Sequence, residues 1–192
     1  LCMHFLGFLF HRLLLFLPLV DYDDHGLLRG RLAERWEPTP DYREWIYHLR
    51  PNLRWHDGVP VTAHDVEFTL DLLTHPDVFA WGKDAFPAYT VIDDLTIRIR
   101  VSHEGHLSLQ REIVHYPRHL LQDAPPQKLY EADFWRRPVG NGPYRYARSV
   151  PQTMMELEAN PDYWSGRPRI ERVVLKFDNS SAAADLLKGD VD

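Results

Sequence analysis

Residues 55–66 constrain the fold more than any other stretch, because they predict the end of a strand, a tight turn and the start of a helix in close succession. Gly58 can adopt the positive φ that such a turn often needs, and Pro60 cannot donate a hydrogen bond to a continuing sheet. Thr62 is a favourable helix N-cap, and Asp65 follows three residues later, where a capping box usually has Glu or Gln. We therefore expect a helix that begins directly after Thr62.

Alternating apolar and polar residues predict strands on both sides of this helix. Every odd residue of 95–101 is apolar, and this segment follows a shorter strand at 90–92 through Asp93 and Asp94. The same reasoning predicts strands at 45–49, 144–148, 155–159 and 173–177. Ser180 can cap a following alanine-rich helix that ends near Lys188. The fold class is therefore α+β, with a mixed sheet and short covering helices.

The first twenty residues are very apolar, but His11 and Arg12 interrupt them. A charge in the middle of the run disfavours a membrane span. The run also lacks the basic start and the small-residue cleavage site of a signal peptide. We expect residues 1–20 to form a buried amphipathic helix.

Composition excludes several classes of function. Lys and Arg number 22 against 28 Asp and Glu, so the net charge of −6 gives no basic surface field for nucleic acid. Cys2 is the single cysteine, so no internal disulfide and no cysteine-based zinc site can form. The sequence contains neither a Gly-x-Ser-x-Gly elbow nor a Walker loop. We expect a protein that is not an enzyme and that needs no cofactor.

A series of short motifs, in order over nearly the whole chain, resembles the family 5 extracellular solute-binding proteins, which are the dipeptide-, oligopeptide- and nickel-binding receptors of ABC importers. The motifs occupy residues 32–36, 47–51, 55–58, 62–66, 91–96, 117–121, 138–144, 160–164 and 188–192. Each motif alone is weak evidence. Their shared order and spacing make coincidence improbable.

The resemblance implies the first lobe of a two-lobed periplasmic-binding-protein type II fold. Residues 1–35 and 139–192 would form an incomplete core of that lobe, and residues 36–138 its inserted subdomain. In the family the chain continues into a second lobe, and a first strand and secretion signal precede the part that corresponds to Leu1. The resemblance therefore implies an N-terminal fragment.

By the same resemblance, the parent protein would capture a solute, most often a peptide, between its two lobes without chemical change. ABC permease subunits in the membrane would then recognise the closed form. The receptor would be periplasmic or a cell-surface lipoprotein. Nickel chelates and oligosaccharides are alternative cargoes.

Two other functions remain open at this point. Some relatives fuse this domain to a DNA-binding helix-turn-helix, so the chain could be the solute-sensing domain of a transcriptional regulator. A less favoured alternative is a metal-dependent hydrolase, in which His115 and His119 would converge on one metal. Pro117 lies between these two residues and disfavours a regular helical zinc pair.

The resemblance also suggests ligand-binding residues. Trp81 lies where an aromatic residue of nickel-binding relatives faces the ligand, and His4 and Leu9 fall where relatives present side chains to the cleft. Asn141 and Gly142 belong to a Gly-Asn-Gly turn that either borders this cleft or is a backbone turn in which Asn tolerates a strained φ. Four tryptophans within the family motifs are expected to be packing residues: Trp36, Trp45, Trp55 and Trp164.

Overall fold

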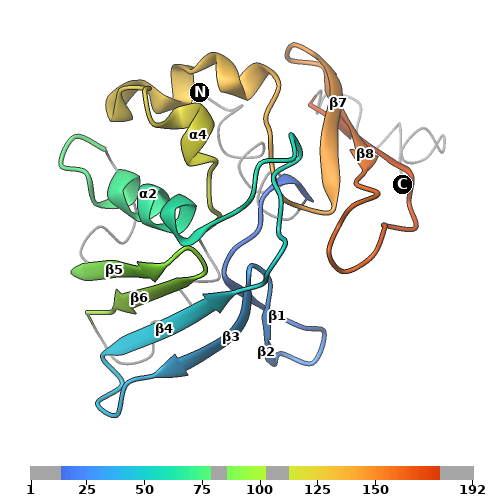
Figure 1. The fold of residues 1–192 in the computed structure, drawn as a ribbon. Coiled ribbons are helices and arrows are strands. Elements are labelled where there is room, and N and C mark those ends of the chain that lie inside the picture. The colour runs from blue at the N-terminus through green and yellow to red at the C-terminus, as the bar shows by residue number, and fades with distance from the viewer. Residues whose placement is uncertain (1–13, 79–85, 103–112, 178–192) are drawn as a thin grey trace.

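The computed structural model describes residues 14–78, 86–102 and 113–177, whose strands form three antiparallel sheets (Figure 1). The first sheet pairs β1 (Val20–Tyr22) with β2 (Leu28–Gly30). The second has the order β3-β4-β6-β5 and consists of β3 (Ala33–Pro38), β4 (Glu44–Leu49), β5 (Ala88–Asp93) and β6 (Thr96–Arg100). The third has the order β7-β8-β9 and consists of β7 (Tyr144–Val150), β8 (Met154–Ala159) and β9 (Arg172–Lys176).

Short helices cover the four-stranded sheet on one side, as Figure 1 shows. Helix α2 (Ala63–Thr74) packs against β5 and β6, and α4 (Arg118–Leu121) packs against α2. Two 3-10 helices follow, η3 (Pro126–Glu131) and η4 (Asp133–Arg136). This arrangement confirms the α+β class with short covering helices.

The predicted alternation in 95–101 is confirmed by the burial of β6. Ile97 and Ile99 are fully buried, whereas Arg98 and Arg100 between and after them are exposed. The antiparallel register places Tyr47 of β4 directly opposite Ile97, so the buried faces of the two strands coincide. The other predicted strands agree with the observed ones to within two residues.

Of the described residues 14–20, only Leu14 and Leu15 have helical backbone, so the predicted helix is wrong for residues 16–20. The backbone is extended from Phe16, reaches an isolated bridge between Pro18 and Val114, and enters β1 at Val20. The physical reason is tertiary hydrogen bonding. The carbonyl groups of Leu15, Leu17 and Leu19 accept N–H donors from three segments that are distant in the sequence, around residues 141, 115 and 31. The remainder, residues 1–13, lies outside the described residues.

Residues 14–20, called the central segment below, belong to one hydrophobic core that contacts every sheet. Fully or almost fully buried members come from the extended segment, β4, the 55–58 turn, α2, β6 and β8, and they include Phe16, Tyr47, Trp55, Leu70, Ile97 and Leu157. Trp36 and Trp45 pack against this core while partly exposed. Trp164 keeps 38% of its surface exposed, and its ring stacks against the Arg50 guanidinium at 3.8 Å. The domain boundary predicted between residues 35 and 36 falls inside β3.

No helix within the described ranges is long and apolar enough to cross a membrane. The predicted helix between Ser180 and Lys188 lies beyond the described residues.

Candidate functional site

The turn at residues 55–58 and the start of α2 are joined by one buried carboxylate. Asp65 Oδ2 accepts the Thr62 backbone N–H at 2.8 Å and the Trp55 indole N–H at 3.3 Å. Its Oδ1 accepts the backbone N–H of Arg118 at 3.0 Å. The predicted capping box is therefore present, and Gly58 has the expected positive φ of 91°. Asp65 also connects the helix start to the turn before it and to α4.

His56, in the same turn, connects it to the Gly-Asn-Gly segment. Its Nδ1 accepts the Gly140 backbone N–H at 3.1 Å, and its Nε2 lies 3.1 Å from the Gly142 carbonyl oxygen, to which it can donate. The backbone N–H of His56 also donates to the Gly140 carbonyl at 2.8 Å. This pattern requires the neutral ring with its proton on Nε2.

The electrostatic surroundings of His56 agree with the neutral ring. The pKa of His56 is lowered from 6.5 to about 4, mainly by burial and to a smaller extent by the nearby Arg145 guanidinium. The hydrogen bond to the Gly142 carbonyl and the charge of Asp57 raise the pKa but do not outweigh burial. His56 is therefore uncharged near neutral pH and acts as a fixed hydrogen-bonding bridge.

The Gly-Asn-Gly turn is held by close backbone approach, so the interpretation that Asn tolerates a strained φ there is wrong. Asn141 and both glycines have φ outside the left-handed region. A Cβ on Gly140 would lie 1.9 Å from the Leu15 carbonyl oxygen, and one on Gly142 would lie 2.4 Å from that of Leu14. Glycine is needed here because the backbone of the central segment fills the space of a side chain.

The 55–58 turn, the Gly-Asn-Gly turn and the central segment meet at one junction, and Asn141 and Gly142 are buried in it. Asn141 is 3% exposed, and its Oδ1 accepts the Leu17 backbone N–H at 2.9 Å. Its Nδ2 has no hydrogen-bond partner among the described residues. The Gly142 carbonyl also accepts the Asn160 side-chain amide at 3.1 Å. Contact of either residue with a ligand remains a prediction.

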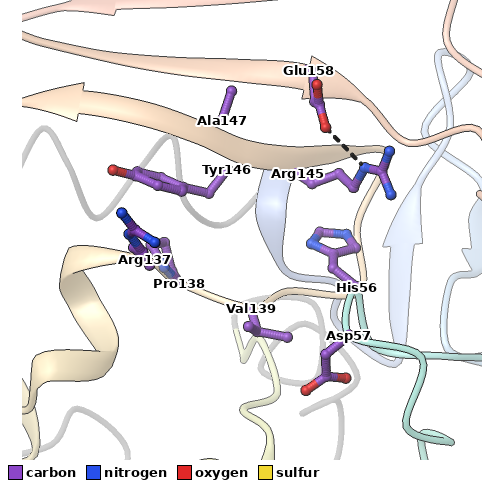
Figure 2. A pocket seen from close by; sticks show the side chains of 9 residues that line it. All are labelled: His56, Asp57, Arg137, Pro138, Val139, Arg145, Tyr146, Ala147 and Glu158. Atoms are coloured by element: carbon purple, nitrogen blue, oxygen red, sulfur yellow. Dashed lines mark ion pairs between the residues drawn. The ribbon is translucent and has the colours of Figure 1, made fainter.

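A pocket of about 500 Å³ opens beside this junction (Figure 2). Its lining comes from the 55–58 turn, the connection into β7, and strands β7 and β8: His56, Asp57, Arg137, Pro138, Val139, Arg145, Tyr146, Ala147 and Glu158. Figure 2 shows Arg145 and His56 at one side of the pocket and Arg137 and Tyr146 at the other. Glu158 forms an ion pair with Arg145, with 3.3 Å between the carboxylate oxygen and Nε.

Asn141 and Gly142, two of the predicted ligand residues, do not line this pocket. Trp81, His4 and Leu9 lie outside the described residues. Of the pocket residues, sequence reasoning singled out His56 and Asp57 as parts of a turn and Pro138 and Val139 as parts of the 138–144 motif, and none of them as a ligand residue. The other pocket residues lie about 80 to 100 positions after His56 and Asp57 in the chain, and no local pattern links them to that turn.

His115 and His119 have different surroundings. His115 is fully buried, neither ring nitrogen has a hydrogen-bond partner among the described residues, and burial lowers its pKa to about 3. His119 instead pairs through Nε2 with Asp57 Oδ2 at 2.8 Å. In the part of the chain that the structure describes, no group of three or more His, Cys, Asp or Glu side chains is placed to hold a metal ion.

Comparison with known proteins places this fold and these motifs in context. A Brucella ovis protein named as an ABC transporter peptide-binding protein is 32% identical over 185 residues, which are 92% of this chain and 35% of that protein. The periplasmic oligopeptide-binding protein OppA of Haemophilus influenzae is 29% identical, over 91% of this chain and 36% of its own. The chain thus spans little more than a third of the length of these relatives.

Solved structures give the same result. NikZ from Campylobacter jejuni, in complex with Ni(L-His), superposes with a TM-score of 0.83 at 25% identity and covers 93% of this chain and 37% of its own. AppA from Bacillus subtilis, in complex with a nonapeptide, has a TM-score of 0.85 at 24% identity with the same coverage. The sequence profile of the bacterial extracellular solute-binding proteins, family 5 (middle region), matches residues 28–192. The chain therefore belongs to the family 5 bacterial extracellular solute-binding proteins.

Proposed function

We propose that this chain is the first-lobe part of a receptor that captures a solute, most often a peptide, for an ABC importer. The observation that carries the proposal is the family match over residues 28–192, together with relatives named as peptide-binding proteins that align over nine-tenths of the chain. Capture needs no bond to be made or broken. It needs only a closed state with higher affinity for the solute than the open state.

The proposal includes partners and location. The closed receptor would dock on ABC permease subunits, and it would work outside the cytoplasmic membrane, in the periplasm or as a lipoprotein at the cell surface. The names of the relatives above favour import over a solute-sensing domain of a transcriptional regulator. Nothing in the surroundings of His115 and His119 supports the hydrolase alternative.

The division into subdomains is part of the same proposal. Residues 1–35 and 139–192 would belong to the core of the first lobe, and 36–138 to an inserted subdomain. In support, the four-stranded sheet and α2 all lie between residues 33 and 100, and the three-stranded sheet lies between residues 144 and 176. The His56 bridge would then join the two subdomains, and Asn141 and Gly142 would support the cleft from behind or border it.

Calorimetry on the full natural chain tests the proposal. We expect heat of binding from a pool of random tripeptides to pentapeptides, and none from the same pool after complete acid hydrolysis to amino acids. Nickel with L-histidine and a neutral oligosaccharide are titrated in parallel. Binding of either of these in place of peptide would keep the receptor function and change the cargo. No binding by any of the three classes would contradict the receptor function.

A further inference from the structure

We propose that the pocket between β7 and the 55–58 turn binds the carboxylate of a small organic solute, with Arg137 and Arg145 as the counter-charges. The inference rests on the charges and contacts of this pocket and does not depend on the import function.

Two arginines and two carboxylates line the pocket, so their charges balance in number, but they are not all paired with one another. Asp57 is paired with His119 at 2.8 Å, and Glu158 is paired with Arg145 at 3.3 Å. Arg137 is exposed, and its side chain has no ion-pair or hydrogen-bond partner among the described residues. Two acidic groups at the pocket thus have a cationic or donor partner, while one guanidinium has none.

Arg145 can contribute a second set of donors. Glu158 lies 3.3 Å from its Nε as an ion pair, but within the described residues that Nε makes no hydrogen bond, so the guanidinium keeps donors for a ligand. Guanidinium groups bind carboxylates through paired, charge-assisted hydrogen bonds. Arg137 and Arg145 lie at different sides of the pocket in Figure 2, so a solute with two carboxylates can place one at each guanidinium.

His56 shapes the pocket without competing for the anion. Both ring nitrogens are occupied by the backbone of Gly140 and Gly142, and the low pKa of about 4 keeps the ring neutral. The carbon part of a solute would contact Pro138, Val139 and the Tyr146 ring, which also line the pocket. A volume of about 500 Å³ is within the usual range for a small-molecule site and is ample for a dicarboxylate.

The test is calorimetry or NMR titration of the full natural chain with glutarate, and with its uncharged diamide, glutaramide, as the control ligand. We expect dissociation of glutarate on the order of millimolar, because so few non-hydrogen atoms limit the affinity. The chain should bind glutaramide too weakly to measure. Equal binding of the two compounds would overturn the proposal.

Arg136 and Arg137 provide a matched pair of variants. Both are exposed arginines, but Arg136 pairs with Asp133 at 3.4 Å and does not line the pocket. We expect R137Q to weaken glutarate binding roughly tenfold, the usual effect of losing a charge-assisted hydrogen bond. R136Q should leave it unchanged. Equal loss in both would mean general charge attraction and would refute a specific site.

A third variant and a second ligand complete the experiment. A147D adds a negative charge to the pocket wall at an exposed position, so it should also weaken glutarate binding. The tripeptide Gly-Gly-Glu tests whether the carboxylate can come from a peptide. A response to R137Q with glutarate alone assigns the pocket to free carboxylates, and a response with both ligands extends it to acidic peptides. No response with either overturns the proposal.

Discussion

At the scale of single residues, two side chains in adjacent motifs hold the junction together by opposite means. Asp65 is a buried carboxylate that accepts N–H groups from three segments. His56 is a neutral ring that both accepts from and donates to the Gly-Asn-Gly turn. Both contacts are satisfied only when the turns around them are in place, so each residue reports on the integrity of the junction.

Protonation of His56 should weaken the fold in acid. Its pKa is lowered to about 4 in the folded chain from 6.5, so the unfolded chain binds the proton first as the pH falls. The free energy of unfolding should therefore decrease as the pH falls from about 6.5 towards about 4, with His115, whose pKa is about 3, acting in the same direction. Urea unfolding at a series of pH values measures this decrease.

The H56Q variant separates His56 from the other titrating groups. Gln can keep one of the two hydrogen bonds but does not titrate, so H56Q should be less stable at neutral pH and lose less stability on acidification. Carboxylates and His115 contribute equally to both proteins. Parallel pH curves for wild type and H56Q would show that His56 does not contribute to acid sensitivity.

At the scale of elements, local patterns locate the strands but do not decide what each face meets. Alternation over residues 155–159 places Glu156 of β8 on the face opposite Met155 and Leu157, yet it is only 7% exposed. Arg148 of β7 and Arg172 of β9 cover it, with nitrogen to oxygen distances of 2.7 Å and 3.0 Å. The order of strands in the sheet brings these charges together, and alternation within one strand carries no information about that order.

The turn before β7 should tolerate no side chain at Gly140. A Cβ there would meet the Leu15 carbonyl oxygen at 1.9 Å, so the central segment would have to move. We expect Gly140→Ala to lower the free energy of unfolding by about 3 kcal/mol or more, as other severe steric strains in cores do. Urea denaturation followed by circular dichroism gives this value.

Gly26→Ala is the matched control for that variant. Gly26 has a positive φ of 75°, but a Cβ there would have nothing within 4 Å. It should therefore cost only the backbone strain, about 1 kcal/mol. If the two alanine variants lose the same stability, close packing of Gly140 on the central segment is not what requires glycine.

At the scale of the whole molecule, one core serves all three sheets. Its members include Phe16 from the central segment, Tyr47 and Ile97 from the four-stranded sheet, and Leu157 from the three-stranded sheet. The two proposed parts of the lobe therefore share their interior. A chain with one continuous core usually unfolds in a single cooperative step.

We expect unfolding of this chain in urea to show a single transition, with the same midpoint by tryptophan fluorescence and by far-ultraviolet circular dichroism. Trp36, Trp45 and Trp55 lie in the proposed inserted subdomain, whereas circular dichroism also reports β7 to β9. Two separated midpoints would mean that the inserted subdomain is stable alone, in contrast to the shared core.

Local patterns were enough to predict the family, helix α2 and six of the nine strands, but not β1, β2 or β3. The capping residues Thr62 and Asp65, the turn at Gly58 and the alternation in β6 are local signals, because they depend on neighbours within a few residues. The path of residues 16–20 depends on the tertiary structure, because these residues are apolar enough for a helix but are held extended by N–H groups from later segments that bind the Leu17 and Leu19 carbonyls. The pocket also depends on the tertiary structure, because folding of the chain brings His56, Arg137, Arg145 and Glu158 together and no repeat in the sequence relates them.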